Sequence, residues 1–175
     1  MKKIIAAIVL VFFTLCGFSK NYPSIENLDS ESLFSLNLDS VEQISYDTIE
    51  ANYIQICNTI KRHRGCWNKY YNIGVYEYKK YVFEILQYTN GYTTFTYLVS
   101  KANDGFPKML LVDMRTGDQI DVSFKIRGGL IYLSYTEHCG EFPITVNEVY
   151  CLDERFSARQ SSEKKFFENI DIIPE

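Results

Sequence analysis

The most regular pattern of apolar and polar positions runs from Ile120 to Thr136. Every second residue is apolar up to Gly128-Gly129, and the alternation resumes after these glycines. A period of two is typical of a strand with one buried face, and paired glycines accept the positive φ angles of a tight turn. The segment therefore predicts an antiparallel hairpin. The expected cross-strand pairs are Phe124 with Leu133 and Ile126 with Ile131 on the apolar face, and Lys125 with Tyr132 and Ser123 with Ser134 on the polar face.

A second hairpin is predicted around Asn90-Gly91, between apolar runs at Tyr81–Thr89 and Tyr92–Ser100. This dipeptide between such runs is the strongest short hairpin signal. Both faces carry apolar side chains, so we expect this hairpin to be central in its sheet or covered on both sides. A two-residue turn at Asn90-Gly91 pairs Leu86 with Phe95, Val82 with Val99, Phe83 with Leu98 and Ile85 with Thr96.

Three further strands are expected at Ile73–Lys79, Lys108–Asp113 and Ile144–Leu152. Glycine, proline and aspartate mark the connections between strands, since these residues favour turns. The connecting segments are a loop at Asn103–Pro107, a turn at Arg115–Asp118 and a loop at Gly140–Pro143.

Ahead of the strands, Ser45–Gly65 has apolar residues at helical spacing. Asp47 and Glu50 have capping-box spacing, and the cations of Lys61–Arg64 suit the negative end of a helix. The pattern predicts an amphipathic helix, and the β-branched residues of Tyr53–Ile60 leave a strand as the alternative. Shorter helical turns are expected at Ser30–Leu36, within a polar lead-in, and at Phe166–Ile170.

These elements predict an α+β fold, in which one amphipathic helix is followed by a six- to seven-stranded antiparallel meander sheet. A closed meander β-barrel is the alternative, because closure removes exposed strand edges. The sequence contains no internal repeat, low-complexity tract or linker that would divide it.

The first residues have the features of a secretory signal. Lys2-Lys3 precedes an apolar run from Ile4 to Phe18, with a small residue at Ser19. We expect residues 1–19 to be a signal peptide and residues 20–175 to be a single exported domain. Lipidation at Cys16 is not expected, because Phe13-Thr14-Leu15 lacks the small residue that usually precedes a lipidated cysteine. No later segment is long enough to span a membrane.

The charge of the chain disfavours some partners. The formal net charge is −4, and cleavage of a leader containing two lysines makes the mature domain more acidic. An acidic domain has no electrostatic reason to hold nucleic acid or an anionic membrane. Neutral or basic protein surfaces are the natural partners, although this charge also serves solubility.

Four cysteines remain after the leader: Cys57, Cys66, Cys139 and Cys151. An even number in an exported domain predicts two disulfides, with three possible connectivities. A helix through Cys57 keeps it too far from Cys66 for a bridge, which predicts pairing with Cys139 or Cys151. A Cys57–Cys66 bridge would instead favour a hairpin there.

The sequence offers little for catalysis or metal binding. His63 and His138 lie near Cys66 and Cys139, but their spacing matches no established ligand pattern. We expect no cofactor and no metal. Asp113, Asp118 and Asp121, with Glu84 on a nearby strand, offer paired carboxylates for acid–base chemistry or a cation site. The favoured interpretation is that Asp113 and Asp118 serve a turn and that Asp121 lies on the polar face of the sheet.

Aromatic residues are the strongest functional signal. The chain has 14 tyrosines, 12 phenylalanines and one tryptophan. Tyrosine and tryptophan often form the energetic centres of protein interfaces, although strands also favour tyrosine as core cover. The interface candidates are Trp67, Tyr70, Tyr71, Tyr76, Tyr78, Tyr97 and Tyr132.

These observations favour a non-enzymatic, periplasmic protein-binding domain, for which an immunity-type inhibitor of a toxin is a concrete version. The alternative is a small-molecule carrier with an aromatic-lined barrel or cleft. A second alternative is a hydrolase that uses His138 with a carboxylate such as Asp121.

Overall fold

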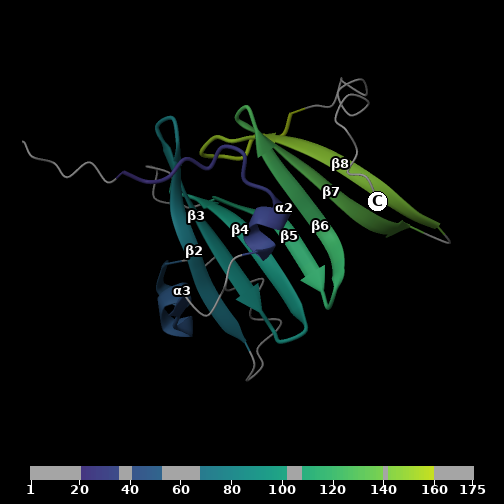
Figure 1. Cartoon of the computed structure of the whole chain (residues 1–175), viewed down its shortest axis with the longest axis horizontal. Helices are drawn as coiled ribbons and strands as arrows, with labels where there is room; N and C mark the ends of the chain where they lie inside the picture. The colour runs from purple at the N-terminus through teal and green to yellow at the C-terminus, as the bar shows by residue number, and fades with distance from the viewer. Residues whose placement is uncertain (1–20, 36–40, 53–67, 102–107, 140–141, 160–175) are drawn as a thin grey trace, which may run out of the picture.

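The computed structural model describes residues 21–35, 41–52, 68–101, 108–139 and 142–159. These residues form two short helices and one eight-stranded antiparallel sheet, in which each strand pairs with the next along the chain (Figure 1). The helices are α2 (Ser30–Phe34) and α3 (Tyr46–Asn52). The strands are β1 (Glu42–Ile44), β2 (Lys69–Tyr78), β3 (Tyr81–Thr89), β4 (Thr93–Ser100), β5 (Lys108–Thr116), β6 (Gln119–Arg127), β7 (Leu130–Cys139) and β8 (Phe142–Cys151).

The predicted combination of helix and antiparallel meander is confirmed, and the predicted number of strands was too low. The additional strand, β1, has only three residues and pairs with β2. It lies in a polar stretch with no alternation of apolar residues, so its sequence carries no strand signal. The sheet does not close into the alternative meander barrel, since β1 and β8 lie at its two ends.

The hairpin at Gly128-Gly129 has the predicted register. All four expected pairs between β6 and β7 are present, and Arg127 and Leu130 flank the turn. The two glycines have φ angles of 59° and 76°, and residues that carry a Cβ atom rarely adopt such positive φ angles. Two glycines in sequence therefore fixed both the turn and the pairing.

The hairpin between β3 and β4 differs from its prediction by two residues. Tyr88 lies opposite Phe95, where Leu86 was expected. The Asn90 side chain accepts hydrogen bonds from the amides of Tyr92 and Thr93 at 3.0 and 2.7 Å, so Asn90 precedes the turn. Gly91, with a φ of 88°, then occupies the first central position. A shift of two residues leaves every side chain on its expected face.

Several element boundaries also differ. The strand predicted at Ile73–Lys79 begins earlier, at Lys69, and β8 begins at Phe142 instead of Ile144. Helix α3 begins at Tyr46 and is capped by Ser45, whose hydroxyl accepts from the amide of Thr48 at 3.2 Å. The predicted capping role of Asp47 was therefore wrong. The rest of the helix predicted to Gly65, and the one at Phe166–Ile170, lie outside the described residues.

An N-terminal segment (residues 21–35) crosses one face of the sheet, from β2 to β6 (Figure 1). At β2, the amide of Glu77 donates to Pro23 O at 3.0 Å; at β6, the amide of Ile126 donates to Leu28 O at 2.7 Å. Helix α2 follows, with Asp29 as its N-cap. The expected helical turn at Ser30–Leu36 is thus confirmed in its described part. We call the face that this segment covers the inner face.

The apolar core has two parts, one on each face of the sheet. The inner cluster is made by strands from β3 to β7, by the N-terminal segment and by the residues after β8. The outer cluster lies beneath α3 on the opposite face, which we call the outer face. Buried members of the inner cluster are Ile25, Leu33, Phe83, Ile85, Leu98, Val112, Phe124, Ile126, Ile131, Leu133, Leu152 and Phe156. Those of the outer cluster are Ile49, Tyr70, Leu86, Tyr88 and Val99.

Candidate functional site

The outer face of β4 and β7 carries two of the predicted interface tyrosines. Because neighbours along a strand point to opposite faces, Tyr132 lies outward between the buried Ile131 and Leu133. By the same argument, Tyr97 lies outward beside the buried Leu98. Both tyrosines are partly exposed, and burial raises the pKa of Tyr97.

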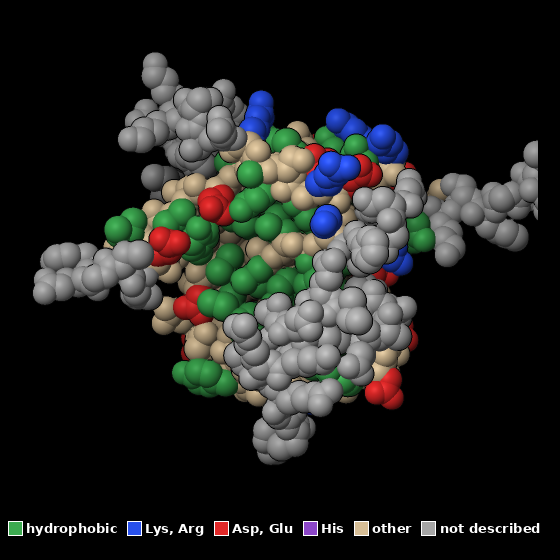
Figure 2. All heavy atoms as spheres, turned by 180° about the vertical axis from the view of Figure 1, so that it is seen from behind, with side chains coloured by type: hydrophobic (Ala, Val, Ile, Leu, Met, Phe, Trp, Pro, Cys, Tyr) green, Lys and Arg blue, Asp and Glu red, His purple; other side chains and the backbone are tan. Residues whose placement is uncertain are grey.

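The surroundings of these two tyrosines combine apolar and cationic side chains. Leu111 of β5 lies opposite Tyr97, and Lys125 of β6 lies opposite Tyr132. Figure 2 shows apolar side chains running across the middle of the face seen from behind. We call the set Tyr97, Leu111, Lys125 and Tyr132 the outer patch. Tyr97 itself packs against the outer cluster beneath α3, which also takes in Met109 of β5. The patch therefore begins where the part of the outer face covered by α3 ends.

The other predicted interface residues do not join this patch. Tyr70 is 5% exposed and stacks on Tyr88, with ring centroids 5.2 Å apart. Tyr76 and Tyr78 pack against the inner cluster, on the opposite side of the sheet. The structure thus distributes the predicted tyrosines over both faces and the core. Tyr71 is partly exposed on β2, and Trp67 lies outside the described residues.

The ends of the β2–β3 and β6–β7 hairpins meet at one end of the sheet, where they line an open depression of about 540 Å³. Tyr78, Tyr81 and Cys151 contribute to its walls. The Nζ atoms of Lys79 and Lys80 lie 5.0 and 5.2 Å from the centroids of neighbouring tyrosine rings. The depression therefore combines aromatic walls with two lysines and one carboxylate, that of Asp153.

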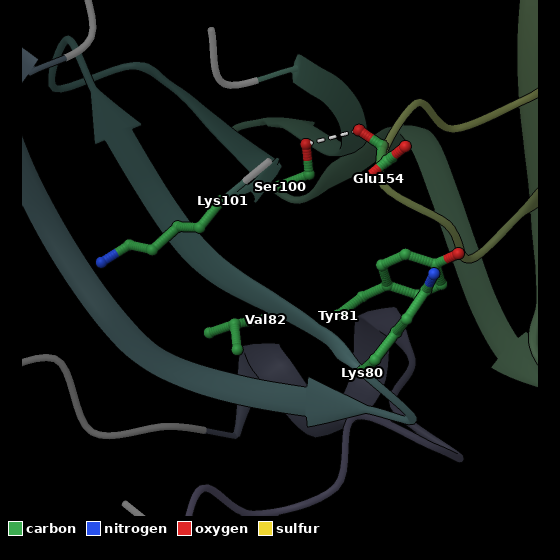
Figure 3. A pocket seen from close by; sticks show the side chains of 6 residues that line it. All are labelled: Lys80, Tyr81, Val82, Ser100, Lys101 and Glu154. Atoms are coloured by element: carbon green, nitrogen blue, oxygen red, sulfur yellow. Dashed lines mark hydrogen bonds between the residues drawn. The ribbon is translucent and has the colours of Figure 1, made fainter. Parts of the chain in front are cut away.

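A smaller pocket of about 110 Å³ adjoins this depression and shares Lys80 and Tyr81 with it (Figure 3). In Figure 3, Lys80 and Tyr81 lie side by side, and Lys101 extends away from them. The Ser100 hydroxyl donates to the carbonyl oxygen of Glu154 at 2.7 Å, so its proton is engaged.

Three of the four carboxylates considered for acid–base chemistry are engaged by other side chains. Glu84, which is 4% exposed, pairs with Lys101 at 2.6 Å. Asp113 pairs with Arg115 at 3.2 Å. Asp121 accepts from Thr116 and Gln119 at 2.6 and 2.9 Å. The expectation that Asp113 serves only a turn was wrong, since Asp113 is 3% exposed within the sheet.

The structure describes the backbone of one of the two histidines. His138 pairs with Pro143 in the backbone of the β7–β8 hairpin, and His63 lies outside the described residues. Within the described ranges, no group of three or more histidine, cysteine or acidic side chains is arranged to hold a metal ion.

A polar cluster on β7 and β8 was not predicted from the sequence. The Tyr150 hydroxyl donates to Glu148 at 2.6 Å, and this bond raises the pKa of Tyr150 to about 12. The pKa of Tyr135 is also raised, first by desolvation and then by the charge of Glu148. Glu148 and Tyr150 lie two residues apart on one strand and so share a face, a spacing that could have revealed the pair.

The backbone limits how the cysteines can pair. Cys139 lies opposite Phe142 at one end of β8, and Cys151 is the last residue of that ten-residue strand. The ends of such a strand lie about 30 Å apart at about 3.3 Å per residue, whereas bridged Cα atoms lie within about 7 Å. A Cys139–Cys151 disulfide is therefore excluded. Cys151 is free in this structure, and Cys57 and Cys66 lie outside the described residues.

Two further findings bear on what the protein is. None of the helices in the described ranges has the length and apolar character needed to cross a membrane. Comparisons with family models, curated proteins and solved structures found no match.

Proposed function

We propose that this chain is a non-enzymatic, exported domain that binds another protein through the outer patch. The proposal is supported mainly by one observation: Tyr132 and the exposed Lys125 lie on the outer face of β6 and β7, and among the described residues neither strand contributes to the outer cluster beneath α3. The inner face of the same two strands is packed into the inner cluster. Tyrosine offers a large, stiff contact area with a polar tip, which suits the centre of a protein interface.

The packing of the inner face supports the choice of a protein partner over an enclosed ligand. The inner face of the sheet is covered by apolar side chains from the N-terminal segment and from the residues after β8, which pack on those of the strands. A carrier would need a cavity of several hundred Å³ inside the curled sheet, and in the described residues this space is filled by Ile25, Leu33 and Phe156.

The charge of the patch indicates which surfaces it suits. Lys125 is exposed beside Tyr132, so this part of an otherwise acidic chain presents a cation next to an aromatic ring. An acidic or neutral rim on the partner complements that pair. We further propose that the partner is a toxin of the same compartment, which the domain would neutralise as an immunity-type inhibitor.

A matched pair of variants tests the outer patch. The mature domain carrying Tyr132→Ala is compared with Tyr92→Ala, which removes a ring that is 73% exposed in the β3–β4 turn. The wild-type domain serves as bait for proteins exported by the same cells, and the affinity of any captured protein is measured by calorimetry. We expect Tyr132→Ala to weaken binding at least tenfold and Tyr92→Ala to leave it unchanged. Equal affinities for the two variants would contradict the proposal.

A second candidate function is favoured by the depression between the hairpin ends. Its two tyrosine walls would suit the apolar part of a small molecule, and its two lysines, which outnumber the single carboxylate of Asp153, would suit an anionic group on it. Binding there predicts that Tyr81→Ala and Lys80→Ala abolish the stabilisation given by such a ligand in a thermal-shift screen, while Tyr132→Ala preserves it. Retention of the shift in both depression variants would exclude this candidate.

A further inference from the structure

A bulge in β5 turns an acidic side chain into the interior of the sheet. Tyr97 pairs with Leu111, but the preceding Thr96 pairs with Asp113, so Val112 is an extra residue on β5. Regular alternation would have placed Asp113 on the outer face beside Leu111. The bulge instead places it opposite Thr96, which points inward. Both Thr96 and Asp113 are buried, at 0% and 3% exposed.

Thr96 is the middle residue of a polar row across three strands. Gln87 of β3 pairs with it on one side and Asp113 of β5 on the other. The Gln87 amide nitrogen donates to the Thr96 hydroxyl oxygen at 3.3 Å. On the far side, Asp113 Oδ2 accepts from Arg115, whose other nitrogen donates to Ser30 O at 2.8 Å. Helix α2 is thereby tied to this row.

Two oxygen atoms of the row are buried without a hydrogen-bond donor. They are Gln87 Oε1 and Asp113 Oδ1, the two such side-chain atoms in the described part of the chain. The Thr96 hydroxyl accepts from Gln87, and its own proton meets no acceptor among the described residues. A buried polar atom left unpaired costs about 1–3 kcal/mol. The row thus presents two acceptors and one donor at neighbouring positions.

We propose that one buried water molecule binds to this row. It donates its two protons to Asp113 Oδ1 and Gln87 Oε1 and accepts the proton of the Thr96 hydroxyl. A buried water typically makes about three hydrogen bonds, which is the number offered here. A metal cation suits the row less well, because Arg115 already neutralises Asp113 and the Thr96 proton would point at the cation.

The water would supply hydrogen bonds between the strands at the bulge. A bulge leaves one residue unpaired and locally disrupts the hydrogen bonds between strands. Thr96 has the shortest of the three side chains and lies between the other two, so a water bound at its hydroxyl would bridge Gln87 and Asp113. In this arrangement, the water links β3, β4 and β5 beneath α2.

A crystal structure at about 1.5 Å resolution tests the proposal directly. We expect a density peak within hydrogen-bond distance of Asp113 Oδ1, Gln87 Oε1 and Thr96 Oγ1. A row without a peak, or with its oxygens turned onto protein donors, would overturn the proposal. A peak surrounded by five or six oxygens at about 2.4 Å would identify a cation instead, and would overturn it as well.

Variants in solution provide an independent measurement. Thr96→Val removes the hydroxyl while keeping the shape of the side chain, and Thr96→Ser keeps the hydroxyl. Long-lived internal waters are counted by magnetic relaxation dispersion of the water nuclei. We expect one fewer long-lived water in Thr96→Val and no change in Thr96→Ser. Gln87→Leu removes the other neutral partner of the water at a partly exposed position, and it replaces Thr96→Val if that variant does not fold. Equal numbers of long-lived waters in wild type, Thr96→Val and Gln87→Leu would contradict the proposal.

Discussion

The ring of Tyr78, at the end of β2, lies directly against the backbone of Gly129 in the turn between β6 and β7. A Cβ atom at Gly129 would lie 2.7 Å from Tyr78 Cζ. The amide of Leu152 donates to the carbonyl oxygen of the same glycine at 2.9 Å. Gly129 therefore joins three segments that are distant in sequence, and this contact holds one end of the sheet together.

Gly129→Ala is expected to destabilise the protein more than Gly128→Ala does. Both residues have positive φ angles, so each substitution costs about 1–2 kcal/mol of backbone strain. A Cβ at Gly128 meets nothing within 4 Å, whereas one at Gly129 collides with Tyr78. We expect an additional cost of about 1–3 kcal/mol from this overpacking, measured by urea denaturation.

The excess cost at Gly129 should depend on Tyr78. In a Tyr78→Ala background, the difference between the two glycine variants is expected to fall to about zero, as a double-mutant cycle would show. If the excess persists in that background, the ring of Tyr78 is not its cause.

Asp29→Ala is expected to lower the free energy of unfolding by about 1 kcal/mol at pH 7 through the loss of the α2 N-cap. The pKa of Asp29 is lowered, mainly by the hydrogen bond from the Ser32 side chain. A lowered folded-state pKa contributes stability above the unfolded-state value of 3.8, and this contribution is lost as the pH falls through the folded-state value. The difference between wild type and variant should therefore shrink below about pH 4.

Asp29→Asn is the matched control, because asparagine caps a helix without a charge. Its stability relative to Asp29→Ala should stay constant across the same pH range in chemical denaturation. A wild-type advantage over Asp29→Ala that is undiminished at pH 2 would show that protonation does not weaken the cap.

Tyr150→Phe tests the pair that Tyr150 forms with Glu148. The pKa of Tyr150 is raised from its ordinary value of 10.0 to about 12, because the hydrogen bond to Glu148 requires the protonated phenol. The bond thus stabilises the fold fully below pH 10 and loses its effect as the pH rises towards 12. Tyr150→Phe should be less stable than wild type at pH 9, and the difference should decline above pH 10.

This decline is read from urea midpoints at successive pH values, with Tyr92→Phe as the control for an exposed tyrosine. Parallel curves for wild type and Tyr150→Phe from pH 9 to 12 would mean that the hydrogen bond does not persist in solution.

Peptide mapping without reductant is expected to show no Cys139–Cys151 link, because β8 separates these residues by about 30 Å. If all four cysteines of the mature chain are oxidised, the two bridges must each join Cys57 or Cys66 to Cys139 or Cys151. Detection of a Cys139–Cys151 peptide in the folded, monomeric protein would contradict the register of β7 and β8.

Local signals in the sequence were reliable where one short segment sets its own geometry. Gly128-Gly129 specifies a positive-φ turn, and the alternation on each side leaves a single register with an apolar face. Helix α2 follows from Asp29, whose side chain accepts from the amide of Ser32 at 2.8 Å. The outward position of Tyr132 follows from the same alternation, which is why this member of the outer patch was predictable.

Features that depend on distant segments were not accessible in this way. The burial of Tyr70 results from the packing of α3 and of neighbouring strands, which nothing in the strand itself specifies. Two registers of the β3–β4 hairpin are compatible with the alternation, one with Leu86 and one with Tyr88 opposite Phe95. The hydrogen bonds that the Asn90 side chain accepts from Tyr92 and Thr93 favour the second register. The alternation predicts an outward Asp113, but the bulge at Val112 reversed it.

The sequence by itself determined the antiparallel meander, its hairpin turns and the face on which most strand residues lie, because these depend on interactions between near neighbours. Only the tertiary structure decided that the sheet stays open, that the N-terminal segment fills its inner face, and that the tyrosines divide between core and surface. The physical reason is that the burial of a sheet residue depends on which segments pack over its strand. Those segments are far from the residue in sequence, so the residues near it do not specify them.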